Sequence, residues 1–561
     1  MPVASHFAEP LYPEAAFDDS PKVVPCHLRK AELPLLTVCL QSFDMAKHRT
    51  SLGGGKSELR TGRAASHRPV ITLVPLDQSS TTALHEQIFI ALRRIILTGK
   101  LAPGAKLPST RMLSTELRVS RNTVLAAFEQ LSSEGYVESR IGGGTYVASV
   151  PPDERLAARP DEGAKTATLR RSISLSGRGR DFETADVEWA THHRKQVAFK
   201  LGVPAVDVFP FALWEKLNNR VLRRRSPQMF GYGSPIGLGR LRSAVASYLV
   251  SARGVRCEPE QVLILEGAQV AIDLAMRVLL DRGDLAWMEE PGFPGARAAF
   301  QANGARIIPI PVDQDGLSLV AAGSVEPPRM IYVTPSHQFP LGVAMSASRR
   351  QELLRFAETN DTWIIEDDYL SEFRYSGRPV QALQGMDAGG RVIYVGSFSK
   401  TIFPALRLAY LVLPPDLVDV FTAARAATGL QASTPAQAVV ADFISEGHFV
   451  RHLRRMRNLY LERQQVLLHA AKSELDGMLA VRPADAGMHL IGMLPPGIDD
   501  REVSSAAAAA GVECVPLSHC YLGGMSLHGL LLGYPGIRPP LIGRAIRDLS
   551  TVLGPLVDKA R

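Results

Sequence analysis

Hydrophobic residues begin to recur at helical spacing at about residue 80. The segment 83–99, ALHEQIFIALRRIILTG, places its apolar residues on one helical face and ends at Gly99, a residue typical of helix ends. The segment 107–117, LPSTRMLSTEL, predicts a short second helix. Either Ser109 or Thr110 would be its N-cap, because a hydroxyl there can accept a bond from a free backbone N–H group.

A third helix and a hairpin follow directly. The pattern VSRNTVLAAFEQLSSEGYV predicts a helix with Ser120 as its N-cap and an end near Gly135. Residues 136–149, YVESRIGGGTYVAS, alternate in the manner of strands on either side of a glycine triplet, which predicts a β-hairpin. The order of three helices and a Gly-tipped hairpin is that of a winged helix-turn-helix domain.

From about residue 205 the pattern changes to alternating strands and helices. Short apolar runs predict buried strands, and amphipathic segments between them predict helices. Such alternation indicates an α/β fold whose mostly parallel sheet is covered on both faces. The predicted strands include QVLILEG, RMIYVTP, TWIIEDD and RVIYVGS, and the predicted helices include AQVAIDLAMRVLL and RRQELLRFAETN.

Two segments lack any sustained period and set the predicted domain boundaries. Residues 1–75 mix Pro, Ser, Gly and charge, and we expect a mostly disordered extension. Residues 150–204 return to Pro, Gly and charge, and we expect a flexible linker without helix. The predicted domains are therefore the winged helix-turn-helix domain at 80–149 and a large α/β domain at 205–556.

Composition narrows the class of protein only slightly. The 561 residues carry a net charge of +7, which permits binding to nucleic acid without demonstrating it. No apolar run reaches the ~20 residues that a membrane span needs, and the start shows no secretion signal, so we expect no membrane partner. The five cysteines are scattered without a CxxC pair, so we expect no metal site and a cytoplasmic location.

The predicted third helix begins with side chains suited to contacts with DNA. In a helix-turn-helix, the N-terminal end of the last helix enters the major groove. Arg pairs bidentately with guanine, Asn pairs with adenine, and Ser and Thr hold phosphate. The residues at that end are Ser120, Arg121, Asn122 and Thr123. This tetrapeptide alone is more often a surface N-cap, so the interpretation depends on the order of all the elements.

Two further features of this domain fit DNA. Arg111 begins the second helix, where it would face the backbone or a base edge, and Gly143 and Gly144 at the wing would let the backbone approach phosphates. Residues 82–148 resemble the GntR-type winged-helix domain, through LPSTRMLSTEL, VSRNTV, LSSEGYV and GGGTYV. The resemblance implies a double-stranded DNA operator as a partner.

The stretch 395–407, VGSFSKTIFPALR, carries a second kind of chemistry. A lysine beside a Gly/Ser-rich turn can form a Schiff base with an aldehyde where burial or neighbouring charges make its amine reactive. A phosphorylated aldehyde also needs hydroxyl and guanidinium donors for its phosphate. Lys400 would be the amine, and Ser397, Ser399 and Arg407 the phosphate donors.

Three more segments fit an aldehyde cofactor. Gly267, Ala268 and Gln269 lie at a strand-to-helix turn, where backbone N–H groups and the helix dipole favour an anion. Asp367 ends a strand, and a carboxylate facing a pyridine nitrogen keeps that nitrogen protonated. Phe293 offers an aromatic face for stacking.

Each of these residues also has an ordinary structural interpretation. A lone lysine is usually on the surface, Asp367 could cap a strand, Phe293 could belong to the core, and Gly267 could simply make a turn. What favours a cofactor site is the joint order along the chain of turn, aromatic, acidic strand end, lysine and arginine.

That order resembles the fold-type-I aminotransferases. The resemblance runs from about 205 to 555 and includes YGSPIGLGRLRSAVASYL, TPSHQFPLG, IIEDDYLSEFRY and GSFSKTIFPALRLAYLV. It implies a large domain with a smaller C-terminal subdomain, and pyridoxal 5′-phosphate as the cofactor. It further implies that Lys400 is the Schiff-base lysine, that Asp367 faces the pyridine nitrogen, and that Tyr369 binds the ring O3′.

The remaining roles are implied in the same way. Phe293 matches the stacking aromatic, and Ser397, Ser399, Arg407 and the 267–269 turn match the phosphate ligands. Gln338, in PSHQFP, falls at about the position of an asparagine that contacts the ring, although the motif is one residue longer here.

A chain with both halves resembles the MocR/GabR-type transcriptional regulators. The resemblance implies that the aminotransferase-like domain senses pyridoxal phosphate or a small effector, and that the winged helix transmits the result to an operator. It also implies a head-to-tail homodimer. The alternative is an active aminotransferase that carries a DNA-binding domain.

One departure from the aminotransferase pattern weighs against that alternative. Such enzymes usually bind the substrate α-carboxylate with an arginine just before an apolar strand near the C-terminus. Here the region 523–541 has His528 or Leu527 at about that position, and Arg538 follows the strand. We therefore expect little or no turnover of amino acids.

Overall fold

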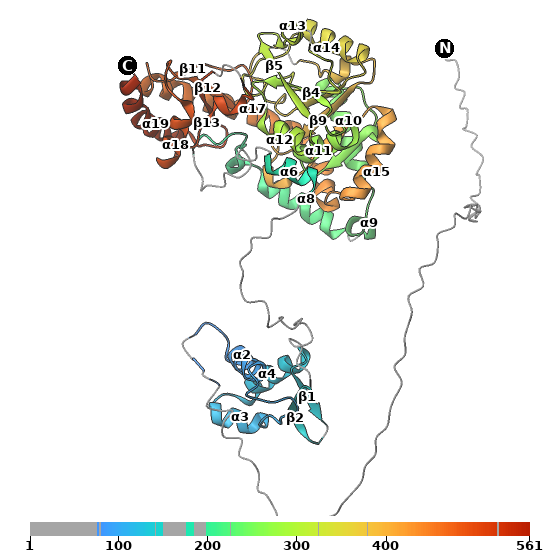
Figure 1. Cartoon of the computed structure of the whole chain (residues 1–561), viewed down its shortest axis with the longest axis vertical. Coiled ribbons are helices and arrows are strands. Elements are labelled where there is room, and N and C mark those ends of the chain that lie inside the picture. The colour runs from blue at the N-terminus through green and yellow to red at the C-terminus, as the bar shows by residue number, and fades with distance from the viewer. Residues whose placement is uncertain are drawn as a thin grey trace, which may run out of the picture. The chain divides into compact units, whose positions relative to one another are not determined.

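The computed structural model divides into two compact units, residues 1–169 and 170–561, whose elements are labelled in Figure 1. The structure describes residues 74, 76–77, 80–140, 142–149, 175–184, 198–224, 226–323, 325–377, 380–523 and 527–560. The predicted N-terminal extension, 1–75, lies outside the described residues except for Val74. The Val74 side chain is buried in the core of the smaller unit.

The smaller unit has the predicted order of three helices and an antiparallel hairpin. Its elements are α2 (Leu84–Leu97), α3 (Thr110–Leu117), α4 (Arg121–Ser133), β1 (Val137–Arg140) and β2 (Gly144–Val147). One apolar core unites them, because each helix turns its hydrophobic stripe inward. Its fully buried members include Ile88, Leu92, Leu113, Val124 and Leu131.

Serine caps fix where the second and third helices begin. The Ser109 hydroxyl accepts a hydrogen bond from the Met112 N–H at 3.2 Å, so Ser109 rather than Thr110 is the N-cap of α3. The Ser120 hydroxyl accepts from the Thr123 N–H at 3.1 Å, as predicted for α4. The short turn between them presents the N-terminal end of α4.

The larger unit is built on an eight-stranded sheet of order β3-β10-β9-β8-β7-β4-β5-β6. The five strands from β9 to β5 run parallel, while β10 and β6 are antiparallel to their neighbours. The strands are β3 (Val262–Leu265), β4 (Leu285–Glu290), β5 (Arg306–Asp313), β6 (Gly316–Leu317), β7 (Met330–Val333), β8 (Trp363–Asp368), β9 (Val392–Ser397) and β10 (Ala409–Val412).

Helices cover both faces of this sheet, as the sequence predicts. Alternate strand residues such as Ile365 and Val395 pack with one set of helices, and Ile364 and Val392 pack with the other. On the first face lie α11 (Ala268–Leu279), α12 (Pro294–Ala302) and α15 (Val418–Thr428). On the second lie α8 (Phe211–Arg223), α10 (Gly239–Arg253), α13 (Leu319–Ala322), α14 (Ala347–Thr359) and α16 (Thr434–Ser445).

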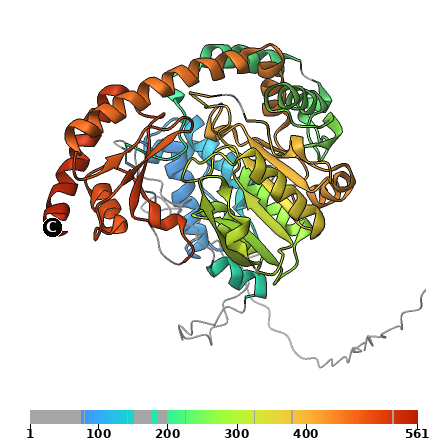
Figure 2. The same cartoon turned by 90° about the horizontal axis from the view of Figure 1, so that it is seen from above.

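The C-terminal part of this unit is a smaller subdomain with a sheet of its own. Its antiparallel sheet has the order β11-β12-β14-β13. Figure 2 shows α17 (His448–Glu474) as the long helix that runs from the large sheet to this subdomain. The other elements are β11 (Ala480–Val481), β12 (His489–Met493), β13 (Val515–Pro516), β14 (Gly529–Gly533), α18 (Asp500–Ala509) and α19 (Pro539–Ala560).

Short elements complete the larger unit. They are α9 (Pro227–Phe230) and the 3₁₀ turns η1 (Val206–Val208), η2 (Pro259–Gln261), η3 (Gln384–Met386), η4 (Pro404–Leu406), η5 (Pro415–Leu417) and η6 (Leu517–Cys520).

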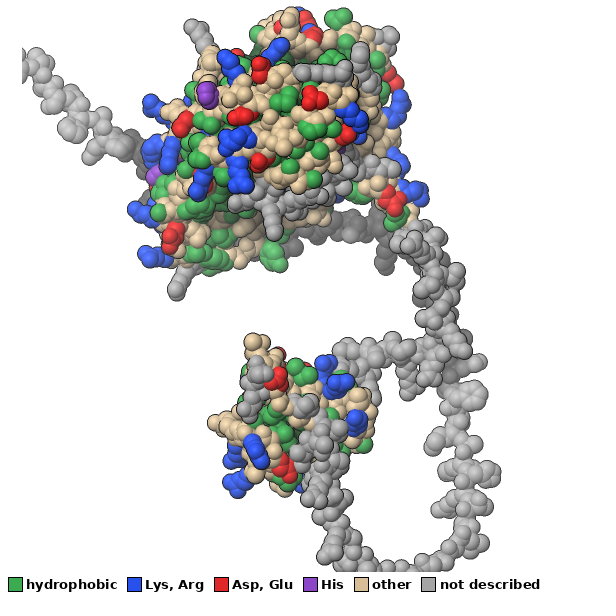
Figure 3. All heavy atoms as spheres, turned by 90° about the vertical axis from the view of Figure 1, so that its left-hand side faces the viewer, with side chains coloured by type: hydrophobic (Ala, Val, Ile, Leu, Met, Phe, Trp, Pro, Cys, Tyr) green, Lys and Arg blue, Asp and Glu red, His purple; other side chains and the backbone are tan. Residues whose placement is uncertain are grey.

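None of the helices among the described residues is both long and apolar enough to cross a membrane. Basic and acidic side chains are interspersed over the face of the larger unit seen in Figure 3.

The predicted linker, 150–204, contains a helix that the sequence did not indicate. Residues Gly177–Thr184 form α6, which packs beside α12. Asp181 in this helix pairs with Arg282, with 2.7 Å between carboxylate oxygen and guanidinium nitrogen. The expectation of a linker without helix was wrong here, because tertiary contact rather than apolar periodicity stabilises α6.

Candidate functional site

Lys400 and Asp367 come together at the carboxyl ends of two neighbouring parallel strands. Asp367 lies near the end of β8, opposite Val395 of β9, and Lys400 follows three residues after β9 ends. Asp367 is buried and accepts a hydrogen bond from the Tyr332 hydroxyl at 2.6 Å. The fold therefore brings an amine and a carboxylate together at the carboxyl end of the sheet.

Burial changes the proton affinity of both groups. It raises the pKa of Asp367 to about 6, against the opposing effects of the Tyr332 hydroxyl bond and the charge of Lys400. It lowers the pKa of Lys400, while the charge of Asp367 acts in the opposite direction. A lysine with a lowered pKa is a better nucleophile at neutral pH, because more of it is unprotonated.

A backbone segment just before η1 closes over Lys400. A Cβ atom at Gly202 would overlap the lysine Nζ, so the amine rests against bare backbone. Gly533 of β14 donates its N–H to the Phe199 carbonyl at 2.9 Å, which ties the same segment to the C-terminal subdomain. The amine is therefore enclosed by residues from both parts of the unit.

Arg407 lies against the turn predicted to hold phosphate. Gly267 is the N-cap of α11, has a φ of 126°, and has no side chain to cap the helix. A Cβ atom there would come within 3.1 Å of the Arg407 guanidinium carbon, so only glycine leaves this space open. The first backbone N–H groups of α11, beginning at Ala268, and the guanidinium together favour an anion.

The two serines of the lysine turn lie beside one another. The Ser397 hydroxyl accepts a hydrogen bond from the Ser399 N–H at 3.2 Å, and both residues are half-buried. This bond leaves the Ser397 proton and the Ser399 hydroxyl as possible donors to a phosphate.

Gln269 and Phe293 lie at the starts of α11 and α12, two helices that cover the same face of the sheet. The Gln269 amide donates to the Gly295 carbonyl at 2.7 Å, which ties α11 to α12. Phe293 is the N-cap residue of α12, and its ring meets the Phe339 ring edge-on at a centroid distance of 5.6 Å. Gln269 therefore has a structural bond in addition to its predicted place at the phosphate turn.

Tyr369 presents a buried hydroxyl that forms no hydrogen bond within the described part of the chain. Its ring lies 6.1 Å from that of Phe339 and 6.1 Å from that of His337, measured between centroids. An unpaired buried hydroxyl costs about 1–3 kcal/mol, and a bound polar ligand would remove that cost. This fits the predicted role of Tyr369 as a ligand of a ring oxygen.

The structure uses the Gln338 amide inside the protein. Its nitrogen donates to the Pro291 carbonyl at 2.8 Å and to the Phe339 carbonyl at 2.6 Å, and its oxygen accepts from the Leu341 N–H at 3.0 Å. Both amide protons and the oxygen thus hold the loop in place. The predicted contact between Gln338 and a cofactor ring stays a prediction, and it requires one of these bonds to exchange.

Three buried polar residues near this site were not predicted from the sequence. Tyr332 binds Asp367, and Glu289 accepts from the Thr334 hydroxyl at 2.6 Å. Burial raises the pKa of Glu289 to about 7 and lowers the pKa of His337 to about 3. Strand alignment could have revealed Tyr332 from the sequence, because it pairs with Ile365 and therefore points to the same face as Asp367. The position of His337 depends on the geometry of its loop, which a sequence pattern does not give.

The C-terminal strand carries no arginine toward the site. In β14, Leu530, Leu531 and Leu532 are completely buried. Arg538 pairs instead with Asp207, with 3.3 Å between nitrogen and oxygen. His528 lies 3.4 Å from Asp500, measured between Nδ1 and Oδ1.

Asp500 in turn accepts bonds from Ser518 and from the Gly529 N–H, so its carboxylate holds the subdomain together. Asp499, Asp500 and His528 offer atoms within 4.8 Å of one another, but the oxygens of Asp500 are already engaged. We assign no metal to this group.

An apolar cluster lies where β14 and the turn η6 approach the candidate site. Leu531 packs with Leu517 and Cys520, and Leu201 and Phe339 pack against them. Leu201 precedes Gly202, which contacts Lys400, and the Phe339 ring faces those of Phe293 and Tyr369. On the side of the C-terminal subdomain the candidate site is therefore bordered by apolar side chains, next to His489 of β12, whose ring lies 5.7 Å from that of Phe339.

In the smaller unit, the predicted DNA contacts lie at the start of α3 and α4. Arg111, Ser120, Arg121 and Asn122 are exposed, while Thr123 is half-buried. The Ser120 and Thr123 hydroxyls lie 2.8 Å apart and form a hydrogen bond, so both support the helix cap. The Arg121 Nε donates a long hydrogen bond, 3.5 Å, to the Thr110 hydroxyl at the start of α3.

The wing carries two cations that were not predicted from the sequence. The Tyr146 hydroxyl donates to the Gly143 carbonyl at 3.0 Å, which fixes the turn that contains Gly143 and Gly144. The Arg140 guanidinium lies 4.7 Å from the centre of the Tyr146 ring, and the Lys106 ammonium lies 5.7 Å from it. The alternation of the hairpin could have shown Arg140 beside Tyr146, whereas Lys106 comes from a separate loop.

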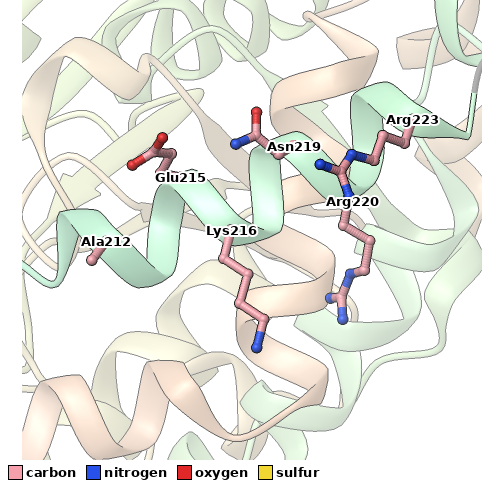
Figure 4. A pocket seen from close by; sticks show the side chains of 6 residues that line it. All are labelled: Ala212, Glu215, Lys216, Asn219, Arg220 and Arg223. Carbon is pink, nitrogen blue, oxygen red and sulfur yellow. The ribbon is translucent and has the colours of Figure 1, made fainter.

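The larger unit also has a shallow groove along α8. Its volume is about 530 Å³, and it is lined by Ala212, Glu215, Lys216, Asn219, Arg220 and Arg223. Figure 4 shows that all six side chains come from this one helix, with Lys216 and Arg220 pointing to the same side. No predicted site residue lines this groove, and we assign it no function.

Comparisons with known proteins agree with this division of the chain. Residues 84–147 match the model of bacterial regulatory proteins of the gntR family, and residues 195–528 match that of aminotransferase class I and II. These matches define the class of protein, a DNA-binding regulator joined to an aminotransferase-like domain. The fold and the order of the two units support the same conclusion.

Relatives of full length identify the family. The chain is 43% identical over 481 residues to the probable rhizopine catabolism regulatory protein MocR of Rhizobium meliloti, which covers 85% of this chain and 95% of that protein. It is 31% identical over 466 residues to the pyridoxine biosynthesis transcriptional regulator PdxR of Corynebacterium glutamicum, with 82% and 94% covered. The chain belongs to the MocR-type family of transcriptional regulators.

Among solved structures, the larger unit is similar to LysN, an α-aminoadipate aminotransferase from Thermus thermophilus. The TM-score is 0.60 at 30% identity, covering 65% of this chain and 93% of that one. That structure is a complex with N-(5′-phosphopyridoxyl)-L-leucine. The fold-type-I architecture predicted for the larger unit is thus confirmed.

Asp367 should make the stability of the cofactor-free protein depend on pH. Its pKa is about 6 when folded, against an ordinary value of 3.8, so the folded state holds this proton more tightly than the unfolded chain. Stability is then lost as pH rises from about 4 through about 6. Asp367→Asn removes this loss, and urea unfolding should show the cofactor-free variant more stable at pH 8 by on the order of 1–3 kcal/mol.

The control for this prediction is the same pair of proteins at pH 5, where the difference should be smaller because Asp367 is then still mostly protonated, and so uncharged, in the folded state. A variant that is less stable than the parent at both values, by the same amount, would show that burial of this charge carries no cost.

Proposed function

We propose that this MocR-type transcriptional regulator binds pyridoxal 5′-phosphate in its aminotransferase-like domain and uses it to sense a small molecule. The observation that carries the proposal is the enclosed pair of Lys400 and Asp367, with the unpaired hydroxyl of Tyr369 nearby and Arg407 at the open N-terminus of α11. These groups match an aldehyde, a pyridine nitrogen, a ring hydroxyl and a phosphate.

The names of two similar proteins support this cofactor. LysN binds a phosphopyridoxyl compound, and the PdxR relative is named for regulation of pyridoxine biosynthesis. When bound, pyridoxal phosphate supplies an aldehyde that reacts with primary amines and a ring that withdraws electrons.

The residues of this chain have separate tasks in the proposed site. Lys400 attaches the cofactor through its amine, and Asp367 holds a proton on the ring nitrogen. Tyr369 donates to the ring hydroxyl oxygen, and the Phe293 ring stacks on the cofactor. The phosphate is held by Arg407 together with Ser397, Ser399 and the 267–269 turn.

Covalent attachment through Lys400 is the direct test of the cofactor. The purified protein should absorb visible light, and borohydride reduction followed by peptide mapping should locate the cofactor on Lys400. Lys400→Ala should abolish the covalent bond, while Lys472→Ala, in the last turn of α17, should leave it unchanged. Protein that stays colourless with added pyridoxal phosphate, and yields no labelled peptide, would contradict the proposed cofactor.

For DNA, we propose that Arg111, Arg121 and Asn122 read the operator, with Ser120, Thr123 and the Gly143-Gly144 wing at the phosphates. We add Arg140 and Lys106, since both present a cation on the Tyr146 ring beside the wing. Base contacts specify sequence, whereas phosphate contacts contribute affinity that depends on salt. The operator would lie in the bacterial cytoplasm.

Arg121 should contribute to sequence recognition and Arg140 to phosphate binding. Arg121→Ala should weaken operator binding by about 1–3 kcal/mol and relax the preference at one base pair. Arg140→Ala should weaken binding to all sequences alike. It should also reduce the slope of log affinity against log salt concentration by about one. Gel-shift titrations on the operator and on scrambled DNA at two salt concentrations measure both effects.

Arg329→Ala serves as the control, because this exposed arginine pairs with Asp361 in the larger unit. The same titrations test the proposed head-to-tail homodimer, since about half a helical turn inserted between two half-sites should abolish tight binding. Equal affinity of the parent and Arg121→Ala for operator would show that α4 is not the recognition helix.

The effector, we propose, is pyridoxal phosphate itself or a compound that reacts with it, rather than an amino acid held by its carboxylate. The support is the apolar cluster around Leu531, together with the sequence of β14, which holds no arginine. A carboxylate buried there without a partner would lose several kcal/mol of solvation. The alternative function, an active aminotransferase, requires that some other group recognise this carboxylate.

Matched pairs of ligands distinguish these functions. With cofactor-loaded protein, α-amino acids should change the visible spectrum much less than the corresponding amines that lack the carboxylate, because only the acids lose solvation. Turnover with a keto acid should be slow or absent. Rapid transamination of any common amino acid, with the cofactor regenerated, would contradict the proposal and favour the enzyme.

A further inference from the structure

Asp367 lies between two other carboxylates on the same strand. In β8 the sequence runs Glu366, Asp367, Asp368, and successive side chains of a strand point to opposite faces. Ile365, two residues before Asp367, packs with α11 and α12, whereas Ile364 packs with α14 on the other face. Glu366 and Asp368 therefore lie on the face opposite to Asp367.

Asp368 is held by a buried cation. One of its oxygens accepts from the Arg253 Nε at 2.8 Å and from the Tyr394 hydroxyl at 2.7 Å. Arg253 is the last residue of α10, and both members of the ion pair are almost completely buried. Such a pair brings little net stability, but loss of one member leaves the other as an uncompensated charge.

The same arginine also fixes two loops at this edge of the sheet. Its Nη2 donates to the Ser336 hydroxyl at 2.8 Å, and its Nη1 donates to the Val380 carbonyl at 2.8 Å. Ser336 directly precedes His337, whose ring faces that of Tyr369. Arg253 thus connects the end of α10, the end of β8 and the loop that borders the candidate site.

Glu366 is also buried, but it accepts its hydrogen bonds from backbone N–H groups. Its oxygens accept from the backbone N–H groups of Leu383 and Gln384 at 2.7 and 2.8 Å, and burial raises its pKa to about 7. Glu366 can therefore take up a proton near neutral pH, which removes its charge. The charge of the buried Arg350 acts on both Glu366 and Asp368, but Asp368 is the one that accepts a direct bond from a guanidinium, that of Arg253.

We propose that Arg253 is a positioning residue for the cofactor site: by pairing with Asp368 it holds the end of β8 and prevents a second buried negative charge from acting on Asp367 and Lys400. The inference rests on the proposed role of Asp367 and Lys400 as cofactor ligands. The Arg253 guanidinium donates to Asp368, Ser336 and Val380 rather than to either of those ligands, so it acts through Asp368.

The surrounding charged groups determine whether the pKa values at the site rise or fall. Asp367 faces Tyr332 from β7 and Lys400 after β9. The charge of Asp368 acts on Asp367, and that of Glu289 acts on Tyr332. The charges of Arg350 and Glu372 lie close to the pair of Arg253 and Asp368. Burial is the main reason that the pKa of Asp367 is raised, and Asp368 raises it further. An unbalanced Asp368 would raise the proton affinity of every titrating group at the site.

The test compares Arg253→Gln with the double variant Arg253→Gln/Asp368→Asn. The single variant should bind pyridoxal phosphate at least about tenfold more weakly and move the pH midpoint of its visible spectrum upward by about one unit. The double variant should return the midpoint toward that of the parent, because the unbalanced charge is gone. Arg253→Lys should rescue the midpoint in part, since it restores the charge without the three directed bonds.

Arg463→Gln is the matched control. Arg463 is also buried, pairs with an aspartate, Asp207, and donates to a backbone carbonyl, but it lies in α17. Its loss should lower the melting temperature without moving the spectral midpoint. This comparison separates an effect on the site from the general cost of removing a buried ion pair.

A second measurement does not need the cofactor. The rate at which an acylating reagent labels Lys400 in cofactor-free protein, followed by mass spectrometry, reports how much of its amine is unprotonated. In Arg253→Gln this labelling profile should move to higher pH, and in the double variant it should move back. If the single variant does not fold, Tyr394→Phe, which removes the second bond to Asp368, should show a smaller shift in the same direction.

The outcomes distinguish this inference from the proposed function. A parent protein that binds no pyridoxal phosphate contradicts the cofactor proposal, while the labelling profile still decides the role of Arg253. Unchanged profiles and affinity in Arg253→Gln, or equal impairment of the single and double variants, would show that Arg253 only supports the fold.

Discussion

The burial of a carboxylate beside an amine is the constraint on which the site depends. Asp367 and Lys400 lie at the end of a sheet whose strands are otherwise apolar, and neither group is solvated as it would be in water. The neighbouring polar groups, Tyr332 above all, reduce this cost without removing it. A protein that retains such an arrangement gives up stability, and the retention itself favours a ligand that uses these charges.

The sequence predicted the elements better than the contacts between them. Periodicity and capping residues were sufficient for the winged helix, because Ser120 and Gly99 act within one or two turns of their own position. The large sheet followed from apolar runs separated by amphipathic helices. The helix α6 was missed because its stability comes from contact with distant residues such as Arg282, which no local pattern records.

For the site, the motif order indicated the residues but not how they are held. Lys400, Asp367 and Arg407 lie where strand ends and helix starts place them, so a correct strand assignment was enough. Gln338 and His528 show where this reasoning fails, since their side chains are engaged with Phe339 and Asp500 through folded loops. Arg253 is 115 residues from Asp368 in the sequence, and only the tertiary structure joins them.

The contact between Gly202 and Lys400 has a consequence for genetics. Even an alanine at position 202 would put a methyl group where the lysine amine lies, and the φ of 65° there disfavours any other residue. A missense change in that codon would therefore displace the lysine amine from a position 198 residues earlier in the chain (400 − 202). Saturation mutagenesis scored by reporter expression would show codon 202 as intolerant, although glycine carries no reactive group of its own.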